Sequence, residues 1–243
     1  MTNGGRRIAT ATGAMLADPA GVGNLPPEAL EPLFDAQYWR ERCELREVSG
    51  GRGSAWFIDS GKRQWALRHF RRGGLIARLS QDRYVWVGEH RVRAFAEFRL
   101  LELLHGRGLS VPQPVAARYA RSGLLYRCDL LTQRISGALP LSAALASDPL
   151  PEPAWRAVGA LIAQLHREGV DHADLNAHNI LIDARGAASV IDFDRGRIRN
   201  PGGWMAGNLQ RLQRSLLKLA RHWPADRFTA QGWAWLQAGY NDR

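Results

Sequence analysis

The fold of this chain is decided by the stretch His172-Ala173-Asp174-Leu175-Asn176-Ala177-His178-Asn179, which is followed by Val190-Ile191-Asp192-Phe193-Asp194. Asp174 can accept or orient the proton of an attacking hydroxyl group. Asn179, five residues later, and Asp192, at the end of a short apolar strand, supply the hard oxygen ligands that Mg²⁺ prefers. A predicted hairpin, with strands over 180–183 and 189–191, separates the two segments. This order of residue types is typical of phosphoryl transfer from ATP, with Mg²⁺ bridging the nucleotide phosphates.

The first segment fits the pattern H-x-D-L-x-x-x-N, the catalytic loop of protein-kinase-like enzymes. Asp and Asn also favour turns, so these residues could merely cap turns, but turn preference does not fix their spacing. We expect His172 to brace the loop rather than transfer protons, because Asp174 is the better-placed base, and we expect His178 to be structural. Asp194 could support the metal ligands or simply end a strand, and the sequence leaves both open.

A glycine-rich turn in the N-terminal half, Gly51-Arg52-Gly53-Ser54, predicts a loop that covers phosphates. Glycines let backbone N–H groups approach phosphate oxygens closely. Such a turn can also be no more than the connection between two strands. Its location in the first strand pair favours the phosphate loop, and backbone groups near Leu131 and Gln133 are expected to meet the adenine base.

A strand cation and a helix acid complete the predicted nucleotide site. Arg68 occupies the position of the lysine in V-A-I-K, so the positive charge is kept while reach and geometry change. Glu97, in the helix predicted over 92–105, is its natural partner. The alternative for Glu97 is an ordinary surface pair with Arg93, four residues earlier.

Composition sets the class of partner. The chain has 243 residues, a formal net charge of +10 and only two cysteines, Cys43 and Cys128. Two cysteines are too few for a disulfide framework, which fits a reducing cytosol. No apolar run approaches the roughly 20 residues that span a bilayer, and we expect no signal peptide. The positive charge favours anionic partners, such as phosphorylated small molecules, an acidic membrane surface or nucleic acid.

The predicted elements run from strands with one inserted helix to helices around a small hairpin, which indicates an α+β fold with two lobes. We expect an irregular N-terminal segment over 1–33, an N-lobe for nucleotide phosphates over 34–133 and a C-lobe over 134–243 with the catalytic loop, metal and acceptor sites. The expected helices and strands are, in chain order, a helix within 34–46, strands 64–70, 115–119 and 123–135, and helices 92–105, 141–146, 153–169 and 208–222.

With these parts assembled, the chain resembles the bacterial lipopolysaccharide kinases, from about residue 34 to residue 218. The resemblance rests on Gly51-Arg52-Gly53, Leu67-Arg68-His69-Phe70-Arg71-Arg72-Gly73-Gly74, Asp174-Leu175-Asn176-Ala177-His178-Asn179 and Ile191-Asp192-Phe193-Asp194. The segment 208–216 is also similar to the closing helix of that family. Asp194 replaces the glycine of D-F-G and no A-P-E segment follows, which disfavours a protein substrate.

The resemblance implies a protein-kinase-like, two-lobed fold and ATP-dependent phosphorylation of the 4-OH of 3-deoxy-D-manno-octulosonic acid (Kdo) on Kdo-lipid IVA. It also implies a cytoplasmic enzyme, peripheral on the inner membrane of a Gram-negative bacterium. Two rivals stay open: a kinase for another acceptor, such as a heptose or an aminoglycoside, and a basic pseudokinase that binds nucleic acid or acts as a scaffold. The intact catalytic positions disfavour the second rival, no RNA-binding motif is present, and no stable protein partner is implied.

Two basic clusters are candidates for contact with the acceptor or an anionic membrane surface. Arg71 and Arg72 follow the third predicted strand, and Arg211, Arg214 and Lys218 recur at i, i+3, i+7 spacing on one helix. The alternative is a solvated surface, which is common for charged helix residues. At least one cluster is expected to steer the protein onto an anionic acceptor or leaflet.

Overall fold

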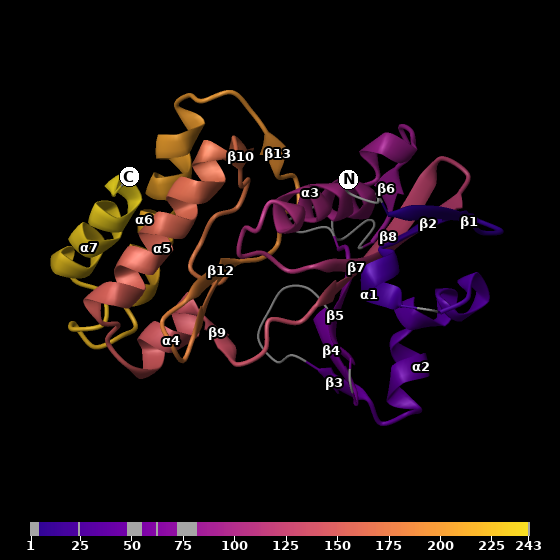
Figure 1. Ribbon diagram of the computed structural model, residues 1–243, viewed down its shortest axis with the longest axis horizontal. Helices are drawn as coiled ribbons and strands as arrows, with labels where there is room; N and C mark the ends of the chain where they lie inside the picture. Colours follow the sequence, from indigo (N-terminus) through magenta and orange to yellow (C-terminus); the bar gives the residue numbers. More distant parts are fainter. Residues whose placement is uncertain (1–4, 24, 48–54, 62, 72–81, 243) are drawn as a thin grey trace. The chain divides into compact units, whose positions relative to one another are not determined.

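A computed structural model describes residues 5–23, 25–47, 55–61, 63–71 and 82–242. The chain divides into two compact units. Unit 1 comprises Met1–Leu103 and Gln113–Arg134, and unit 2 comprises Leu104–Pro112 and Ile135–Arg243. Figure 1 shows the elements of both units. The predicted mixture of a large antiparallel sheet and several helices is confirmed.

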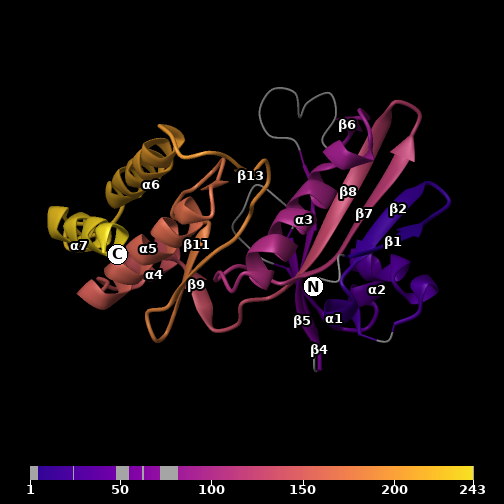
Figure 2. The same cartoon turned by 45° about the horizontal axis from the view of Figure 1, so that its top comes forward.

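Unit 1 is built on one antiparallel sheet, whose strands run in the order β1-β2-β7-β8-β5-β4-β3, with β6 paired to β8. Helix α3 packs beside this sheet (Figures 1 and 2). The strands are β1 Arg6–Ala9, β2 Gly13–Ala17, β3 Leu45–Glu47, β4 Ala55–Ser60, β5 Arg63–His69, β6 Tyr84–Val85, β7 Pro114–Ser122 and β8 Leu125–Gln133. The helices are α1 Pro19–Val22, α2 Ala36–Arg40 and α3 Arg93–Gly106, with short 3₁₀ turns at Pro27–Ala29, Glu31–Phe34 and Glu89–Arg91.

Alternation along β5 separates the core from the functional side of unit 1. Trp65 and Leu67 are almost completely buried and belong to the hydrophobic core. Successive side chains of a strand point to opposite faces, so Arg68 projects away from that core. The register pairs Leu67 with Leu131 and Arg68 with Leu130 of β8, which places Arg68 on a central strand of the sheet.

The N-terminal segment differs from the irregular structure expected over 1–33, because it contains β1 and β2. Strand β2 pairs with β7, and Gly13 lies opposite Ala120. Residues 14–17 are all buried, so β2 lacks the alternation of apolar and polar residues that marks a strand with one solvent-exposed face. The helix expected within 34–46 is also shorter. It is α2, which Asp35 caps through a 2.8 Å bond from the Gln37 N–H.

Unit 2 is mainly helical, with α4 and α5 close to two small antiparallel sheets, ordered β12-β11-β9 and β10-β13. The helices are α4 Leu141–Ser147, α5 Glu152–Arg167, α6 Trp204–Ala220 and α7 Ala230–Asn241. The strands are β9 Ala138–Pro140, β10 Val170–Asp171, β11 Ile180–Asp183, β12 Ala188–Val190 and β13 Arg197–Ile198. The predicted catalytic hairpin is therefore β11–β12, with Ile180 opposite Val190.

Helix α7 was not expected from the sequence, because glycine lowers helix propensity and α7 contains two glycines. These glycines are where α7 meets α5. A Cβ at Gly239 would lie 2.2 Å from the carbonyl oxygen of Arg156, and one at Gly159 of α5 would lie 2.0 Å from that of Leu236. The glycines thus allow two helix backbones to approach closely. Within the described residues, no helix has the length and apolarity needed to cross a bilayer.

Candidate active site

The predicted catalytic loop connects β10 to β11 in unit 2, and burial alternates along it. His172, Leu175 and Ala177 are each at most 1% exposed. The side chain of Asp174, by contrast, is 63% exposed. The buried side chains therefore anchor the loop in unit 2, while the carboxylate of Asp174 stands in solvent where a substrate could reach it.

His172 holds the loop through both ring nitrogens. Nε2 lies 3.0 Å from the carbonyl oxygen of Ile191, so it donates, and Nδ1 accepts from the Asp174 N–H at 3.2 Å. One donating and one accepting nitrogen define a neutral imidazole. Burial lowers the pKa of His172, which favours the same neutral form. The ring also packs on Phe193, with centroids 4.8 Å apart. These contacts make His172 a brace between the loop and the segment that carries Asp192.

Helix α6 supplies the other supports of the loop, from one face. Asn208 Oδ1 accepts from the His172 N–H at 3.2 Å, and Ser215 Oγ accepts from the Ala177 N–H at 3.2 Å. Between them, Arg211 Nη1 lies 3.7 Å from Asp174 Oδ1. Residues 208, 211 and 215 recur at i, i+3, i+7 spacing, so a single helix face contacts the loop at three points.

Asn179 and Asp192 are brought together by the ladder of the catalytic hairpin. The Ile191 N–H donates to the Asn179 carbonyl at 2.9 Å, so Asp192 follows the residue that pairs with Asn179. The side-chain amide of Asn179 donates to the Asp174 carbonyl at 3.0 Å, so its oxygen is the atom that a metal ion would contact. Asp192 has a φ of +64°, a conformation that is costly for a residue with a Cβ and is concentrated at functional sites.

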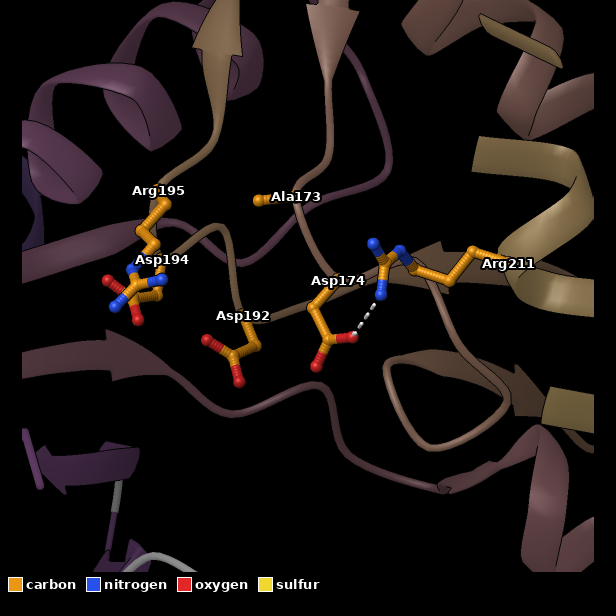
Figure 3. A pocket seen from close by; sticks show the side chains of 6 residues that line it. All are labelled: Ala173, Asp174, Asp192, Asp194, Arg195 and Arg211. Atoms are coloured by element: carbon orange, nitrogen blue, oxygen red, sulfur yellow. Dashed lines mark ion pairs between the residues drawn. The ribbon is translucent and has the colours of Figure 1, made fainter. Parts of the chain in front are cut away.

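A pocket of about 370 Å³ lies beside Asp174 and Asp192 (Figure 3). It is lined by Ala173, Asp174, Asp192, Asp194, Arg195 and Arg211. Three carboxylates thus face two guanidinium groups, an arrangement suited to a metal-bound anion and a polar acceptor. Within the described part of the chain, no three His, Cys, Asp or Glu side chains form a metal cluster. A divalent cation here would take an amide oxygen and complete its ligands with phosphate oxygens or water.

Unit 1 brings together the predicted strand cation and helix acid. Arg68 on β5 forms an ion pair with Glu97 on α3. The side chain of Glu97 is 2% exposed and that of Arg68 is 23% exposed. The guanidinium also lies 4.4 Å from the centre of the Phe70 ring, which restricts its orientation. Arg68 is thus held by a buried carboxylate and an aromatic face.

The adenine contact is predicted near Leu131 and Gln133, where several backbone groups have partners within unit 1. The Gln133 N–H donates to the Gln113 carbonyl at 2.8 Å, and the Arg134 N–H donates to the Gln64 carbonyl at 2.8 Å. Leu131 is buried and paired on both sides, opposite Leu67 and Ala116. These two N–H groups are therefore used within unit 1, because β8 is a central strand, and other backbone groups of the segment would have to meet the base.

The basic residues predicted to meet an acceptor or membrane are only in part among the described residues. The loop Gly51-Arg52-Gly53-Ser54 and Arg72 lie outside the described residues, and Arg71 is exposed. On α6, Arg211 lines the pocket, whereas Arg214 and Lys218 are exposed and are not among the pocket residues. The i, i+3, i+7 cluster is therefore divided between a site residue and two surface residues.

Two supporting residues, Asn208 and Ser215, were missed as site residues although their helix was predicted. Both are polar and lie next to the apolar stripe of α6, in which Leu212 and Leu216 are completely buried. A polar side chain at the border of a buried stripe needs a hydrogen-bond partner. That position was the available signal, and only the fold shows that the partner is the catalytic loop.

Comparison with known proteins gives a consistent result. The family described as "Lipopolysaccharide kinase (Kdo/WaaP) family" matches residues 36–240. A 3-deoxy-D-manno-octulosonic acid kinase of Stenotrophomonas maltophilia strain K279a is 51% identical over 191 residues, covering 77% of this chain and 75% of the relative. The enzyme of the same name from Vibrio parahaemolyticus is 45% identical over 197 residues, covering 79% and 83%. That of Xylella fastidiosa strain M12 is 49% identical over 189 residues, covering 77% and 75%.

Proposed function

Because the chain belongs to the lipopolysaccharide kinase (Kdo/WaaP) family, we propose that it transfers a phosphoryl group from ATP to a hydroxyl of Kdo in lipopolysaccharide biosynthesis. The resemblance predicted from the motifs is confirmed, and the chain is a phosphotransferase. The observation that carries the mechanism is the catalytic loop, in which an exposed Asp174 stands on a braced backbone beside Asn179 and Asp192. The acceptor we propose is Kdo-lipid IVA, phosphorylated at its 4-OH.

The overall architecture we propose is protein-kinase-like, with an N-lobe and a C-lobe. Two observations support it. Unit 1 is an antiparallel sheet with the helix that supplies Glu97, and unit 2 is mainly helical and carries the catalytic hairpin. We place the N-lobe over 34–133 and the C-lobe over 134–243, with 104–112 belonging to the compact unit of the latter.

Asp174 is the group that meets the acceptor hydroxyl. Its carboxylate is exposed and lines the pocket, so it can accept the hydroxyl proton or orient the oxygen for attack. His172 does not compete for that role, because it is buried and both of its nitrogens are already engaged. Its neutral imidazole instead orients the backbone N–H of Asp174 and thereby the carboxylate.

Asn179 and Asp192 fit a Mg²⁺ ion by the chemistry of their donors. The amide oxygen of Asn179, just before β11, and the carboxylate of Asp192, just after β12, are hard ligands at one end of the hairpin. When bound, the ion would neutralise the charge of the nucleotide phosphates. The two residues are held in place for this contact. Asp192 has a positive φ, and the side-chain amide of Asn179 donates to the carbonyl of Asp174.

Arg68 is the cation we propose for the donor phosphates, and Glu97 sets its direction. A guanidinium offers a planar pair of donors to phosphate oxygens, while a buried carboxylate keeps it charged and oriented. The loop Gly51-Arg52-Gly53-Ser54 is proposed to cover the same phosphates. Arg211 is proposed to receive an anionic group of the acceptor, because it lies in the pocket beside Asp174.

The acceptor is lipid-linked, so the enzyme is proposed to work at the cytoplasmic face of the inner membrane, in contact with anionic lipid. Arg71 and Arg72, and separately Arg214 and Lys218, remain proposed contacts with that surface. The described residues place Arg71, Arg214 and Lys218 in solvent, where they are available for it.

The decisive experiment incubates the purified protein with labelled ATP, Mg²⁺ and Kdo-lipid IVA, beside unglycosylated lipid IVA. We expect label on the Kdo-containing lipid alone. Label on a heptose or aminoglycoside acceptor, with none on Kdo-lipid IVA, would favour the rival small-molecule kinase. Absence of transfer to every acceptor, with intact nucleotide binding, would overturn the proposed reaction and favour a scaffold.

A further inference from the structure

The end of the β7–β8 hairpin in unit 1 exposes large apolar side chains. Leu124 is 76% exposed, Val85 58% and Val87 56%, which are the three highest values among the exposed large hydrophobic residues of the described chain. We call these three residues the apolar tip. Clustered exposed apolar side chains on a soluble domain usually mark a surface that is covered by something else.

The apolar tip combines the turn that ends the hairpin with the strand beside it. Strand β6 pairs with β8, so that Val85 lies opposite Leu125, and the Trp86 N–H donates to the Leu124 carbonyl at 2.9 Å. Leu124 lies in the turn between β7, which ends at Ser122, and β8, which begins at Leu125. Its side chain therefore stands at the end of the hairpin, and Val85 lies on the neighbouring strand, opposite the next residue. Figures 1 and 2 both show β6 beside β8.

The base of the tip is rigid, so these side chains are held outward. The Trp86 ring lies 5.0 Å from the Tyr119 ring and 6.0 Å from the Tyr126 ring, between centroids. The guanidinium of Arg121 lies 5.1 Å from the Trp86 ring centre, and its Nε donates to the Gly123 carbonyl at 2.8 Å. The hairpin cannot fold its apolar groups inward without breaking this stack.

The charge around the tip is positive. Arg83, Arg91 and Arg121 are exposed next to these residues in the sequence or in the stack, and we call them the cationic rim. The acids of the same segment are already paired: Asp82 with Arg127 at 2.8 Å, and Glu89 with Arg7 at 2.8 Å. The rim is therefore left to attract an anionic partner.

We propose that the apolar tip inserts into the interface of an anionic bilayer, with the cationic rim at the level of the lipid phosphates. An exposed leucine at the end of a hairpin, with exposed valines and arginines beside it, suits shallow insertion between lipid headgroups. The arginines add attraction to anionic headgroups. The inference rests on the proposed function only in its choice of a membrane partner, and it assigns that contact to residues outside both predicted basic clusters.

Vesicle sedimentation tests the proposal without any phosphoryl transfer, so its failure is separate from failure of the proposed function. We expect the full chain to bind vesicles of phosphatidylethanolamine and phosphatidylglycerol, and to bind phosphatidylcholine vesicles weakly. Leu124→Glu should lower the bound fraction by about tenfold, because a charged side chain replaces the leucine that enters the bilayer. Leu139→Glu is the matched control, since Leu139 is 55% exposed on β9 of unit 2 and should leave binding unchanged.

An environment-sensitive fluorophore tests insertion directly. Cys43 is exposed and Cys128 is buried, so a label on the unaltered chain reports from Cys43, which precedes the edge strand β3. A label at Leu124→Cys, in a Cys43→Ser background, should shift to the blue with anionic vesicles, whereas the Cys43 label should not. The melting temperature of Leu124→Glu should equal that of the unaltered chain, which shows that the variant is folded.

Two results would overturn the inference. The first is equal vesicle binding by the unaltered chain and Leu124→Glu, with no shift of the label at position 124. The second is concentration-dependent self-association that Leu124→Glu abolishes while vesicles have no effect on the label, which would assign the tip to a contact between copies of this chain.

Discussion

The two units hold their functional charges in opposite ways. In unit 1 the Arg68–Glu97 pair is built into the packing, because Glu97 is almost fully buried. In unit 2 Asp174 stands in solvent and is held indirectly, through a neutral His172 and the side chains of α6. A buried ion pair couples function to stability, whereas an exposed carboxylate on a braced loop separates them. Variants of the two sites should therefore fail in different ways.

The largest effect is expected at Asp174. Asp174→Asn should lower kcat by at least about 10²-fold, because the acceptor hydroxyl loses its base. ATP affinity and the melting temperature should stay close to those of the unaltered chain, since the side chain is 63% exposed. Asp226→Asn is a matched control in the same unit, with 62% exposure. Activity of Asp174→Asn within a few-fold of that control would remove Asp174 from the chemistry.

At Arg68, function and stability should fall together. Arg68→Ala leaves Glu97 buried without this partner, which should cost about 3 kcal/mol of unfolding free energy and most of the activity, with a raised KM for ATP. Arg68→Lys should keep part of both. The double variant Arg68→Met, Glu97→Leu should regain stability but not activity, because two apolar groups replace a buried pair. A normal KM for ATP in Arg68→Ala would assign the phosphates to another cation.

These contrasts also show what a single sequence can reveal. The structure brings Asp174, Asn179 and Asp192 together as their spacing predicts, because the hairpin between them is local. Their roles in the reaction stay predictions. The ends of α3, α4, α5 and the hairpin strands were predicted to within a few residues, and among them α5 has the clearest apolar periodicity. Phosphoryl-transfer chemistry and the family followed from these motifs alone.

What escaped prediction depends on contacts distant in sequence. Asn208 and Ser215 gain their meaning only when α6 lies against the catalytic loop. Strand β2 has no alternation of apolar and polar residues, because both of its faces are buried. Helix α7 contains glycines that lower its helix propensity, and these glycines allow its close contact with α5. The N–H groups of Gln133 and Arg134 donate to the carbonyls of Gln113 and Gln64 within unit 1. The local sequence does not predict these partners, because they come from distant segments of the chain.

A variant at Arg211 tests the site of unit 2 through its binding of the acceptor. Arg211→Gln should raise the KM for the Kdo-containing acceptor by about tenfold and leave the KM for ATP unchanged, because one charged hydrogen bond is lost from the pocket. Arg214→Gln, three residues later on α6 and outside the pocket, is the control and should change neither. Equal effects of the two variants would mean that α6 acts through its overall charge rather than through Arg211.

The smallest effect, and the one that compares the units most directly, is their response to pH. Burial lowers the pKa of His172 and of His166 in unit 2 from the usual 6.5. A hydrogen bond to Asp129, at 2.6 Å, raises the pKa of His69 in unit 1 above 6.5. A depressed pKa gives stability that is present above pH 6.5 and lost as the pH falls, because the unfolded state then binds the proton first. A raised pKa gives stability that is present below pH 6.5 and lost as the pH rises through the folded value.

Acidification from pH 8 to pH 5 should therefore weaken unit 2 and strengthen unit 1 around His69. Amide hydrogen exchange on the intact chain, corrected for the intrinsic pH dependence of exchange, would measure both in one sample. Protection should decrease in α5 and β11 and increase in β5 and β8. His69→Gln should abolish the increase in protection of unit 1 without changing unit 2. His172→Gln should reduce the decrease in protection of unit 2 without changing unit 1. Parallel changes in both units, in the unaltered chain, would mean that the carboxylates rather than these histidines control stability in this range.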